Sequence, residues 1–569
     1  FEREVDNKSN EILSSNITMS SSENSNSYGF QKKTIPWNIL ICSDLGFKSE
    51  KPEAITASIL NDFIESKNIN FVGNVKDVSE NRDIFIEYPI KSIKDFSSER
   101  IIHKVLYTHE LQHLCNILQE VMEGVINKEK AFDTIQSRRT LTPPFKEALD
   151  ILRIKNAEAP KHKKTLKKKN PGEKEKALDN IFSSMDLTPT KEKVSDTSNS
   201  ALNNLVSAMS SEYSVTLPKA RIDSLVTKCQ KQINDQVKEI LNNGVFKQYK
   251  ASWLCIRHLL KILGRKNECN FFLYSTSLNA ISDSFIDAMA TLSNQNTAPD
   301  IILFDYPLTF STAHMQLLAT VAENANLHNS ITLTHCGLDE QLINKLQNVD
   351  TLKPLFEEQR FIPLNRLRKN DFSRNLVFTV PPFAIDSKDI LPSFAGGSWL
   401  LLFAIVQKLS YDMSPFEARL TMNDTGVTAE YPLRFASGLT EEHSYEAAEK
   451  GITLLSKEII YPYGTYITTL IDPEIAAELY TYFEYNLLTN RILKIISFML
   501  RDSVIVQDIK NLPNRVKKII IEQLGQYGLL HSEEEVFVSF SENLELEIVV
   551  DSRKEIRSHP FQLQFSFLI

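Results

Sequence analysis

The chain has 569 residues, of which 42% are hydrophobic and 24% charged, and its formal net charge is -8. A chain of this length holds a large buried core divided among several domains, and its charge balance gives no argument for nucleic acid or an anionic membrane as a partner. No apolar run reaches the roughly 18 residues that a membrane span requires, so we expect no membrane insertion.

The N-terminal part divides into a polar tail and a patterned region. Residues 1–35 are rich in Ser, Asn, Glu and Lys and bury too little apolar surface to offset the entropy of ordering, so we expect a disordered tail. Residues 36–154 then show apolar patterns typical of regular structure. We predict a small α/β domain here, with a strand at 37–44, a helix at 52–66, a strand at 84–88 and helices at 101–125 and 143–154.

A polar segment separates this region from the rest of the chain. Residues 155–217 are rich in Lys and Ser, which is typical of a flexible linker. Two short stretches in it, 177–185 and 200–209, have apolar residues at helical spacing. Each is either a docking helix for a partner or a helix folded back on its own domain.

Residues 218–569 form the second predicted domain. Apolar stripes at three- and four-residue steps predict helices from 218 and at 246–263. Short buried strands then alternate with helices, which is the pattern of an α/β core. The sequence therefore predicts an α/β (α+β) fold with mixed sheets flanked by helices, built here from strands at 271–274, 301–306 and 331–334 and helices at 284–292 and 313–325.

The chain ends in three segments that alternate between apolar and polar residues, at 536–540, 544–550 and 561–568. Alternating strands at the end of a chain are readily lent to a neighbouring subunit, and a sheet formed within the chain is the alternative. The candidate residues for such an exchange are the apolar ones of each strand: Val536, Val538, Phe540, Leu546, Ile548, Val550, Phe561, Leu563, Phe565 and Phe567.

One short motif has the residue types of a zinc peptidase. His109, Glu110 and His113 fit the pattern HExxH within a predicted helix, which would place two imidazoles one turn apart with Glu110 as general base. A zinc site needs a further ligand, and no spacing singles one out. The alternative is a helix with two surface histidines and a solvated glutamate.

Two acids follow predicted strands, Asp44 after ILICS and Asp305 after IILF. Such positions are typical of the phosphoacceptor aspartate of receiver domains, but the further acids and the lysine that receivers need are not evident. No GxxxxGK[ST], GxGxxG or GxSxG motif is present. We therefore expect no enzymatic activity, no cofactor and no metal, with the zinc peptidase as the alternative.

The order of the later segments resembles the large sheath subunit of type VI secretion systems, TssC. FKQYKASWLCIRHLLKIL, FFLYS and PDIILFDYPL are similar to its aromatic helix and the strands that follow it. GGSWLLLFAIVQKLS is similar to its buried helix, and TNRILKIISFMLRD stands where the family has an arginine-bearing helix. The resemblance covers roughly residues 200–569 in collinear order. Lys250, Cys255-Ile256 and Pro381-Pro382 depart from the family pattern.

The N-terminal region resembles the small sheath subunit, TssB. WNILICSD is similar to its first strand, and Asp95, Phe96, Ser97 and Glu99 match the DFSPE motif that begins a long helix, with Ser98 in place of the proline. The chain therefore looks like a fusion of two contractile-sheath-like domains, which are normally separate proteins, joined by the lysine-rich linker.

The resemblance implies a structural protein of the bacterial cytoplasm. It would form a helical homopolymer around an inner tube protein, stand on a membrane-anchored baseplate and contract to drive the tube out. In many such systems an AAA+ unfoldase recycles the contracted sheath by gripping a short helix near the start of the large subunit; residues 177–185 or 200–209 are the candidates. A scaffold or adaptor that keeps the sheath fold without polymerising is a further alternative.

Overall fold

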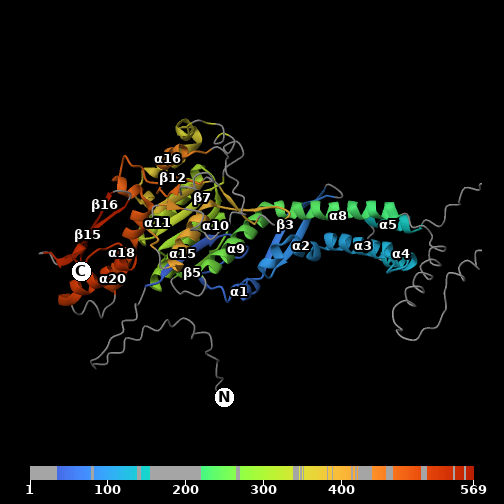
Figure 1. Ribbon diagram of the computed structural model, residues 1–569, viewed down its shortest axis with the longest axis horizontal. Coiled ribbons are helices and arrows are strands. Elements are labelled where there is room, and N and C mark those ends of the chain that lie inside the picture. Colours follow the sequence, from blue (N-terminus) through green and yellow to red (C-terminus); the bar gives the residue numbers. More distant parts are fainter. Residues whose placement is uncertain are drawn as a thin grey trace, which may run out of the picture.

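The computed structural model describes the chain in ordered segments with gaps between them. These are residues 35–78, 82–137, 142–153, 219–263, 269–337, 345, 349, 351–380, 382–386, 389–411, 414–416, 419–420, 439–455, 465–501, 509–541, 545–556 and 559–568. The predicted tail (1–35, apart from residue 35), the predicted linker (155–217) and its two short helices lie outside the described residues. The described part is elongated, with an α/β body at one end and a helical arm at the other (Figure 1).

A seven-stranded sheet forms the centre of the body. Its strands lie in the order β12 (Ile452–Leu454), β8 (Leu376–Val380), β7 (Ile331–Cys336), β6 (Ile301–Leu308), β1 (Trp37–Ser43), β5 (Cys269–Ser275) and β2 (Glu53–Ile55). All neighbours pair in parallel except β2, which is antiparallel to β5. Parallel strands covered on both faces are continuous apolar runs, and every residue of β1 is buried.

β1 belongs to the region predicted as a small N-terminal domain, yet it lies in the middle of this sheet. Ile39 is in register with Phe271 of β5 on one side and with Ile301 of β6 on the other. One continuous hydrophobic core joins residues of both predicted domains. The N-terminal region therefore supplies a central strand to the body, and the boundaries 36–154 and 218–569 stay predictions.

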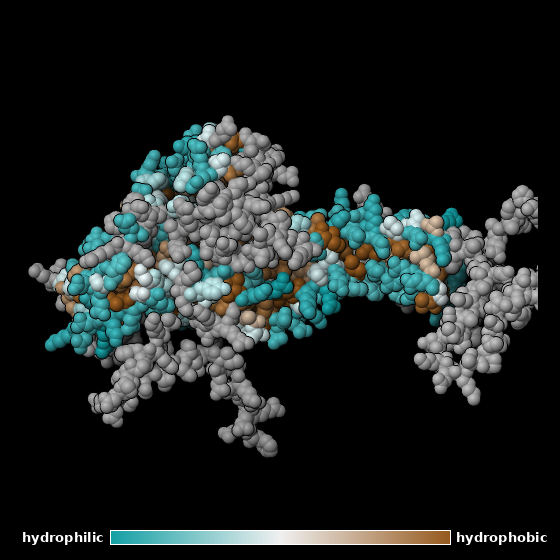
Figure 2. All heavy atoms as spheres, viewed as in Figure 1, coloured by the Kyte–Doolittle hydropathy of each residue, from teal (hydrophilic) through white to brown (hydrophobic). Residues whose placement is uncertain are grey.

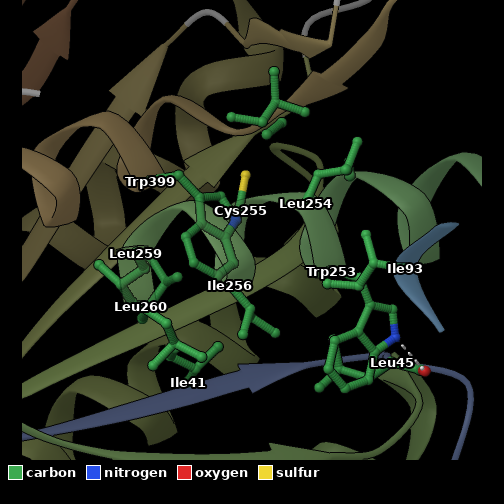
Figure 3. Packing of buried hydrophobic residues seen from close by; sticks show 14 of the residues in the cluster. Ile41, Leu45, Ile93, Trp253, Leu254, Cys255, Ile256, Leu259, Leu260 and Trp399 are labelled. Carbon is green, nitrogen blue, oxygen red and sulfur yellow. Dashed lines mark hydrogen bonds between the residues drawn. The ribbon is translucent and has the colours of Figure 1, made fainter. Parts of the chain in front are cut away.

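Helices cover both faces of the sheet. α9 (Gly244–Leu263), α15 (Gly397–Ser410) and α18 (Phe483–Arg501) share one apolar core with the sheet residues of one face. α10 (Leu278–Asn294) and α11 (Thr312–Leu327) share a second core with the residues of the other face. Figure 3 shows the first core, where the side chains of α9 lie beside Trp399 and Ile41. The predicted α/β class, with a mixed sheet flanked by helices, is confirmed.

The arm extends from the body along a single long helix, α8 (Lys219–Asn242), which lies against α3 (Leu106–Met122) (Figure 1). At the base of the arm, Phe246 contacts three aromatic rings at centroid distances of 5.1 to 6.0 Å, which joins arm and body in one core. The other elements of the arm are β3 (Ile69–Asp77), β4 (Arg82–Ile90), α2 (Ser98–Lys104), α4 (Lys128–Gln136) and α5 (Pro143–Arg153).

Two predicted helices of the N-terminal region were wrong in extent. The segment predicted as helix 52–66 contains β2, the edge strand that pairs with β5, and helix α1 (Leu60–Ser66) begins only after it. The predicted helix 101–125 is interrupted at Val105, which has an extended backbone, so α2 and α3 are separate. As the DFSSER motif predicts, Ser97 caps the first of them, its hydroxyl accepting the Arg100 N–H.

The remaining elements lie mostly in the body and at the C-terminal end. The helices are α13 (Lys353–Phe356), α14 (Ile362–Arg368), α16 (Glu441–Glu449) and α20 (Leu512–Gln526). Two short pairs of strands are β9 (Phe383–Asp386) with β10 (Ser393–Ala395), and β11 (Arg419–Leu420) with β13 (Thr465–Tyr466). A separate three-stranded sheet ends the chain, with β14 (Val536–Phe540), β15 (Glu545–Ile556) and β16 (His559–Leu568).

Candidate functional site

The three alternating segments at the end of the chain form one antiparallel sheet in the order β14-β15-β16. Ile548 in the central strand is in register with Val538 on one side and with Phe565 on the other. The three predicted strands are thus present, and they pair with one another within the chain. Whether any of them is exchanged between subunits stays a prediction.

The candidate exchange residues all lie on one face of this sheet. Val550 of the central strand lies between Val536 of β14 and Leu563 of β16 in the register, and all three are buried. This face belongs to the same apolar core as α18 and α20. The nine described side chains of this set therefore attach the sheet to its own body, and what remains for a partner is the backbone of its two outer strands. The buried or half-buried candidates are Val536, Val538, Phe540, Leu546, Ile548, Val550, Leu563, Phe565 and Phe567.

The distribution of charge across this sheet is unusual for a sheet whose outer strands are to remain unpaired. Proteins usually place charged residues or proline on edge strands, because an open edge is a template for further strands. Here β14 (VFVSF) and β16 (HPFQLQFSFL) have no Asp, Glu, Lys or Arg, and the charged residues are on the central strand β15 (ELEIVVDSRKEI). Pro560, the second residue of β16, is the only proline in these two outer strands, so the eight positions after it have neither a charge nor a proline. Neither outer strand has a second strand partner among the described residues. Phe537 of β14 is 56% exposed. Sequence reasoning found the strands but missed this inversion of charge.

The HELQH motif lies on the solvent side of α3. His109 and His113 are exposed and Glu110 is half-buried, whereas Leu111 and Leu114 on the opposite stripe are buried in the arm. Within the described residues, no group of three His, Cys, Asp or Glu side chains is placed to hold a metal ion. The zinc peptidase alternative stays a hypothesis, and it predicts stoichiometric zinc and loss of peptidase activity in Glu110→Gln.

Polar side chains gather where the central strands end, at the carboxyl edge of the seven-stranded sheet. Asp305 of β6 accepts hydrogen bonds from the hydroxyls of Ser43 (3.0 Å) and Ser252 (2.6 Å). His335 of β7 has Nε2 3.8 Å from Asp305 Oδ1 and Nδ1 2.9 Å from the hydroxyl of Ser398 on α15. Burial lowers the pKa of His335, against the attraction of Asp305. Because Ser398 is fully buried, this network joins α9 and α15 to the sheet and does not present a nucleophile.

The receiver hypothesis placed its two acids at the correct edge. The five parallel strands β1, β5, β6, β7 and β8 can be numbered 1 to 5 in chain order, and they lie side by side in the order 2-1-3-4-5. In sheets with this order, ligands bind beyond the carboxyl ends of the first and third strands, which are β1 and β6 here. Asp44 and Asp305 are at those ends. However, α9 fills this place: Trp253 Nε1 donates to the Leu45 carbonyl at 3.2 Å (Figure 3). Burial raises the pKa of Asp44, and β8 ends in a buried valine, Val380, so a phosphoacceptor set is not assembled.

A buried ion cluster lies at the opposite edge of the sheet. Arg491 of α18 has Nη1 2.9 Å from Oδ1 of Asp300, and Lys494 Nζ is 3.2 Å from the same oxygen. Burial alone would raise the pKa of Asp300, but the two cations hold it below its usual value. Burial lowers the pKa of Lys494 to about 8. Arg491 is the arginine of the helix that the sheath resemblance singles out, and its partner was not evident from the sequence.

A second, largely buried ion pair lies in the body and is hydrogen-bonded to the arm through Ser98. Lys250 of α9 has Nζ 2.5 Å from Oδ2 of Asp389, in the segment between β9 and β10, and Lys250 is fully enclosed. The hydroxyl of Ser98, at the start of α2, donates to the same carboxylate. Lys250 is one of the departures from the family pattern, where an acid is expected. The structure shows that the lysine has its own partner, so this departure is compensated within the chain.

No protein-family model matches the chain, and no curated protein matches it.

Within the described residues, no helix combines the length and the hydrophobicity that crossing a membrane demands.

Proposed function

We propose that the protein is a structural subunit of a contractile sheath of the type VI secretion class, and not an enzyme. It polymerises in the bacterial cytoplasm around an inner tube protein, stands on a membrane-anchored baseplate and drives the tube outward when the polymer contracts. An AAA+ unfoldase is the candidate recycling partner. The polymer forms without nucleic acid and without insertion into a membrane.

The observation that carries this proposal is the pair of uncharged outer strands in the C-terminal sheet. β14 and β16 offer open backbone edges without the charged residues that normally prevent strand addition. Strand addition by a neighbouring copy gives main-chain hydrogen bonds that survive a change in the angle between subunits. Such joints suit a polymer that changes its lattice while it stays connected.

The buried ion clusters support the same proposal from inside the subunit. Buried charge pairs add little net stability, but they penalise alternative packings strongly when they are broken. Asp300, which also accepts the Asn38 N–H of β1, holds β1, β6 and α18 in one arrangement with Arg491 and Lys494. Asp389, paired with Lys250, holds the start of α2 at the base of the arm through Ser98. A subunit that is rigid in this way transmits force, so the free energy released on contraction resides in the interfaces between copies.

Self-assembly of the purified full chain tests the proposal. The chain is concentrated at low salt, sedimented at high speed and compared with a variant that has one added negative charge on an outer strand, Gln564→Glu. Gln564 is exposed and lies opposite Val549 of β15, so the fold is retained. The proposal expects wild-type protein in the pellet and the variant in the supernatant. Wild-type protein that remains monomeric at all concentrations would contradict it.

A further inference from the structure

The arm contains a second open strand edge, on the ribbon of β3 and β4. The two strands pair antiparallel over nine residues each, with Asn74 opposite Phe85 and Lys76 opposite Asp83. No third strand joins this ribbon within the described residues. Isolated two-stranded ribbons are marginal on their own, and this one is supported by α8, which contacts β3.

The outer edge of β3 is closed by side chains of α8 and of Asn243, the residue that follows it. Gln236 Nε2 donates to the Lys76 carbonyl at 2.9 Å, and Gln236 Oε1 accepts the Val78 N–H at 3.0 Å. Asn243 Nδ2 donates to the Asn74 carbonyl at 3.4 Å. These bonds also show the direction of the backbone groups. The carbonyls of Asn74 and Lys76 point away from β4. Their pairs with Phe85 and Asp83 are therefore non-hydrogen-bonded pairs, in which the N–H and C=O groups of both residues point away from the partner strand.

On the outer edge of β4, the backbone groups have a hydrogen-bond partner only near the C-terminal end of the strand, within the described residues. Asp83, Phe85 and Glu87 alternate along the strand, so each directs its N–H and C=O outward. Pro89, the next in the series, has no N–H to satisfy, and its carbonyl accepts a bond from Lys104 Nζ at 3.3 Å. No backbone partner outside the ribbon is present in the described structure for the three residues before it. The open stretch of β4 therefore runs over residues 83–87.

Exposed apolar side chains lie on the same ribbon. Phe85 is 68% and Val72 50% exposed, and Figure 2 shows hydrophobic surface at the base of the arm, where β3 and α8 lie in Figure 1. An open edge next to exposed apolar residues is the usual combination at a site of strand addition.

We propose that the open edge of β4 receives the outer strand β16 of a second copy of this chain. This inference rests on the proposed function and names the joint between copies. Antiparallel pairing of β4 with β4 of another copy, centred on Phe85, would place Asp83 opposite Glu87, and like charges directly opposite are unfavourable. β16 has no charged residue over its ten positions, so it pairs with β4 without that repulsion.

The positions of the two edges determine what such a joint builds. The C-terminal sheet lies at one end of the long axis, and the arm extends from the other side of the body (Figure 1). One copy therefore offers β16 at one place and β4 at another, which makes the contact heterologous. Heterologous contacts that do not close into a ring give open helical filaments, the form that a sheath requires.

Mixed single-cysteine variants test this joint in the full chain. Phe85→Cys protein is combined with Gln562→Cys, Gln564→Cys or Ser566→Cys protein under assembly conditions, and disulfides are formed with copper phenanthroline as the oxidant. A bond between position 85 and β16 then arises only between copies, because the two cysteines are on different chains. The six native cysteines are buried, and the parent protein treated with the same oxidant measures any crosslinking that they cause.

Asn74→Cys provides the matched control. It is exposed like Phe85 and directly opposite it in the ribbon, but it would lie one strand further from an added β16, at about 10 Å between Cα atoms, beyond the reach of a disulfide. The proposal expects a crosslinked dimer with Phe85→Cys and none with Asn74→Cys. Filaments that form without any crosslink at position 85 would overturn the β4 joint and leave the sheath proposal standing. Absence of filaments from the parent protein would overturn both.

Discussion

The guanidinium of Arg491 lies 4.5 Å from the ring centroid of Trp37 and joins the first strand of the chain to one of its last helices. The same arginine donates to the carbonyls of Ile35 and Pro36 and forms an ion pair with Asp300. The planar guanidinium makes all these contacts at once, which a lysine cannot. Arg491 therefore fixes β1 in the centre of the sheet.

Replacing Arg491 by methionine should destabilise the fold strongly. The change leaves the buried Asp300 with Lys494 as its remaining cation, and breaking a buried ion pair typically costs about 3–5 kcal/mol. Urea unfolding of the full chain measures this loss. Arg366→Met, at an exposed position on α14, should shift the free energy of unfolding by less than about 0.5 kcal/mol. Equal effects of the two changes would show that the ion cluster does not hold β1.

Gly396 occupies a position where no side chain fits. A Cβ atom there would lie 2.1 Å from the imidazole of His335, so Gly396→Ala must displace the ring from its place between Asp305 and Ser398. Overpacking of this kind costs about 1–3 kcal/mol. Gly525 in α20 has open space around a Cβ, and Gly525→Ala should stabilise the fold by about 0.5–1 kcal/mol. Thermal unfolding of the two variants should therefore shift in opposite directions; a shift in the same direction would contradict the tight contact.

Stability should fall as the pH is lowered because His335 is buried and neutral. Its folded pKa lies below that of the unfolded chain, so the unfolded state binds a proton first as the pH falls below about 6.5. The stability contributed by this histidine is complete above that pH and is lost progressively below it. His335→Asn keeps a polar partner near Ser398 and removes the titration. Urea midpoints measured across this range should fall less steeply in His335→Asn than in the parent protein.

Ser282→Asn is the control for that pH series. Ser282 is exposed on α10 and does not titrate, so its replacement should leave the slope of stability against pH unchanged. A His335→Asn protein with the same slope as the parent would show that this residue titrates equally in the folded and unfolded states. The network at the carboxyl edge of the sheet would then not depend on a neutral imidazole.

Charged substitutions on β16 should separate assembly from folding. Gln564→Glu adds a negative charge to an exposed position of an outer strand. Charged residues on edges oppose strand addition, and this one would also be repelled by Asp83 and Glu87 of β4. We expect a smaller sedimentable fraction and an unchanged unfolding transition. Ser282→Glu, at an exposed position of α10, should leave both properties unchanged. If Ser282→Glu abolished sedimentation equally, the effect would be one of net charge and not of the edge.

The local elements of this chain were predictable, and the reason is periodicity. Strands β5, β6 and β7 and the alternating C-terminal strands were predicted because their side-chain patterns are regular over their own length. The break at Val105 was not predicted, since the apolar stripe of α3 continues the pattern of α2 across it. The ribbon strand β3 was also missed, because Gly73 and Asn74 interrupt its alternation.

The partners of these elements were not predictable from one sequence. The apolar run of β1 predicted a strand, but it was assigned to a small N-terminal domain, and the sequence did not show that its neighbours, β5 and β6, lie more than two hundred residues later in the chain. Likewise, Arg491 and Lys250 were noted as residues, and their partners Asp300 and Asp389 were not. Which residues pair over such separations in the sequence is determined by tertiary packing, and local propensity gives no information about it.

Electron microscopy of the high-speed pellet from cells that express the full chain tests the central claim most directly. The sheath proposal predicts hollow, striated tubules, built from copies joined through their strand edges. A chain that stays in the supernatant as a monomer or small oligomer would contradict self-assembly, and would favour either a scaffold that keeps this fold without polymerising or, if the same sample contained stoichiometric zinc, a function of the HELQH helix.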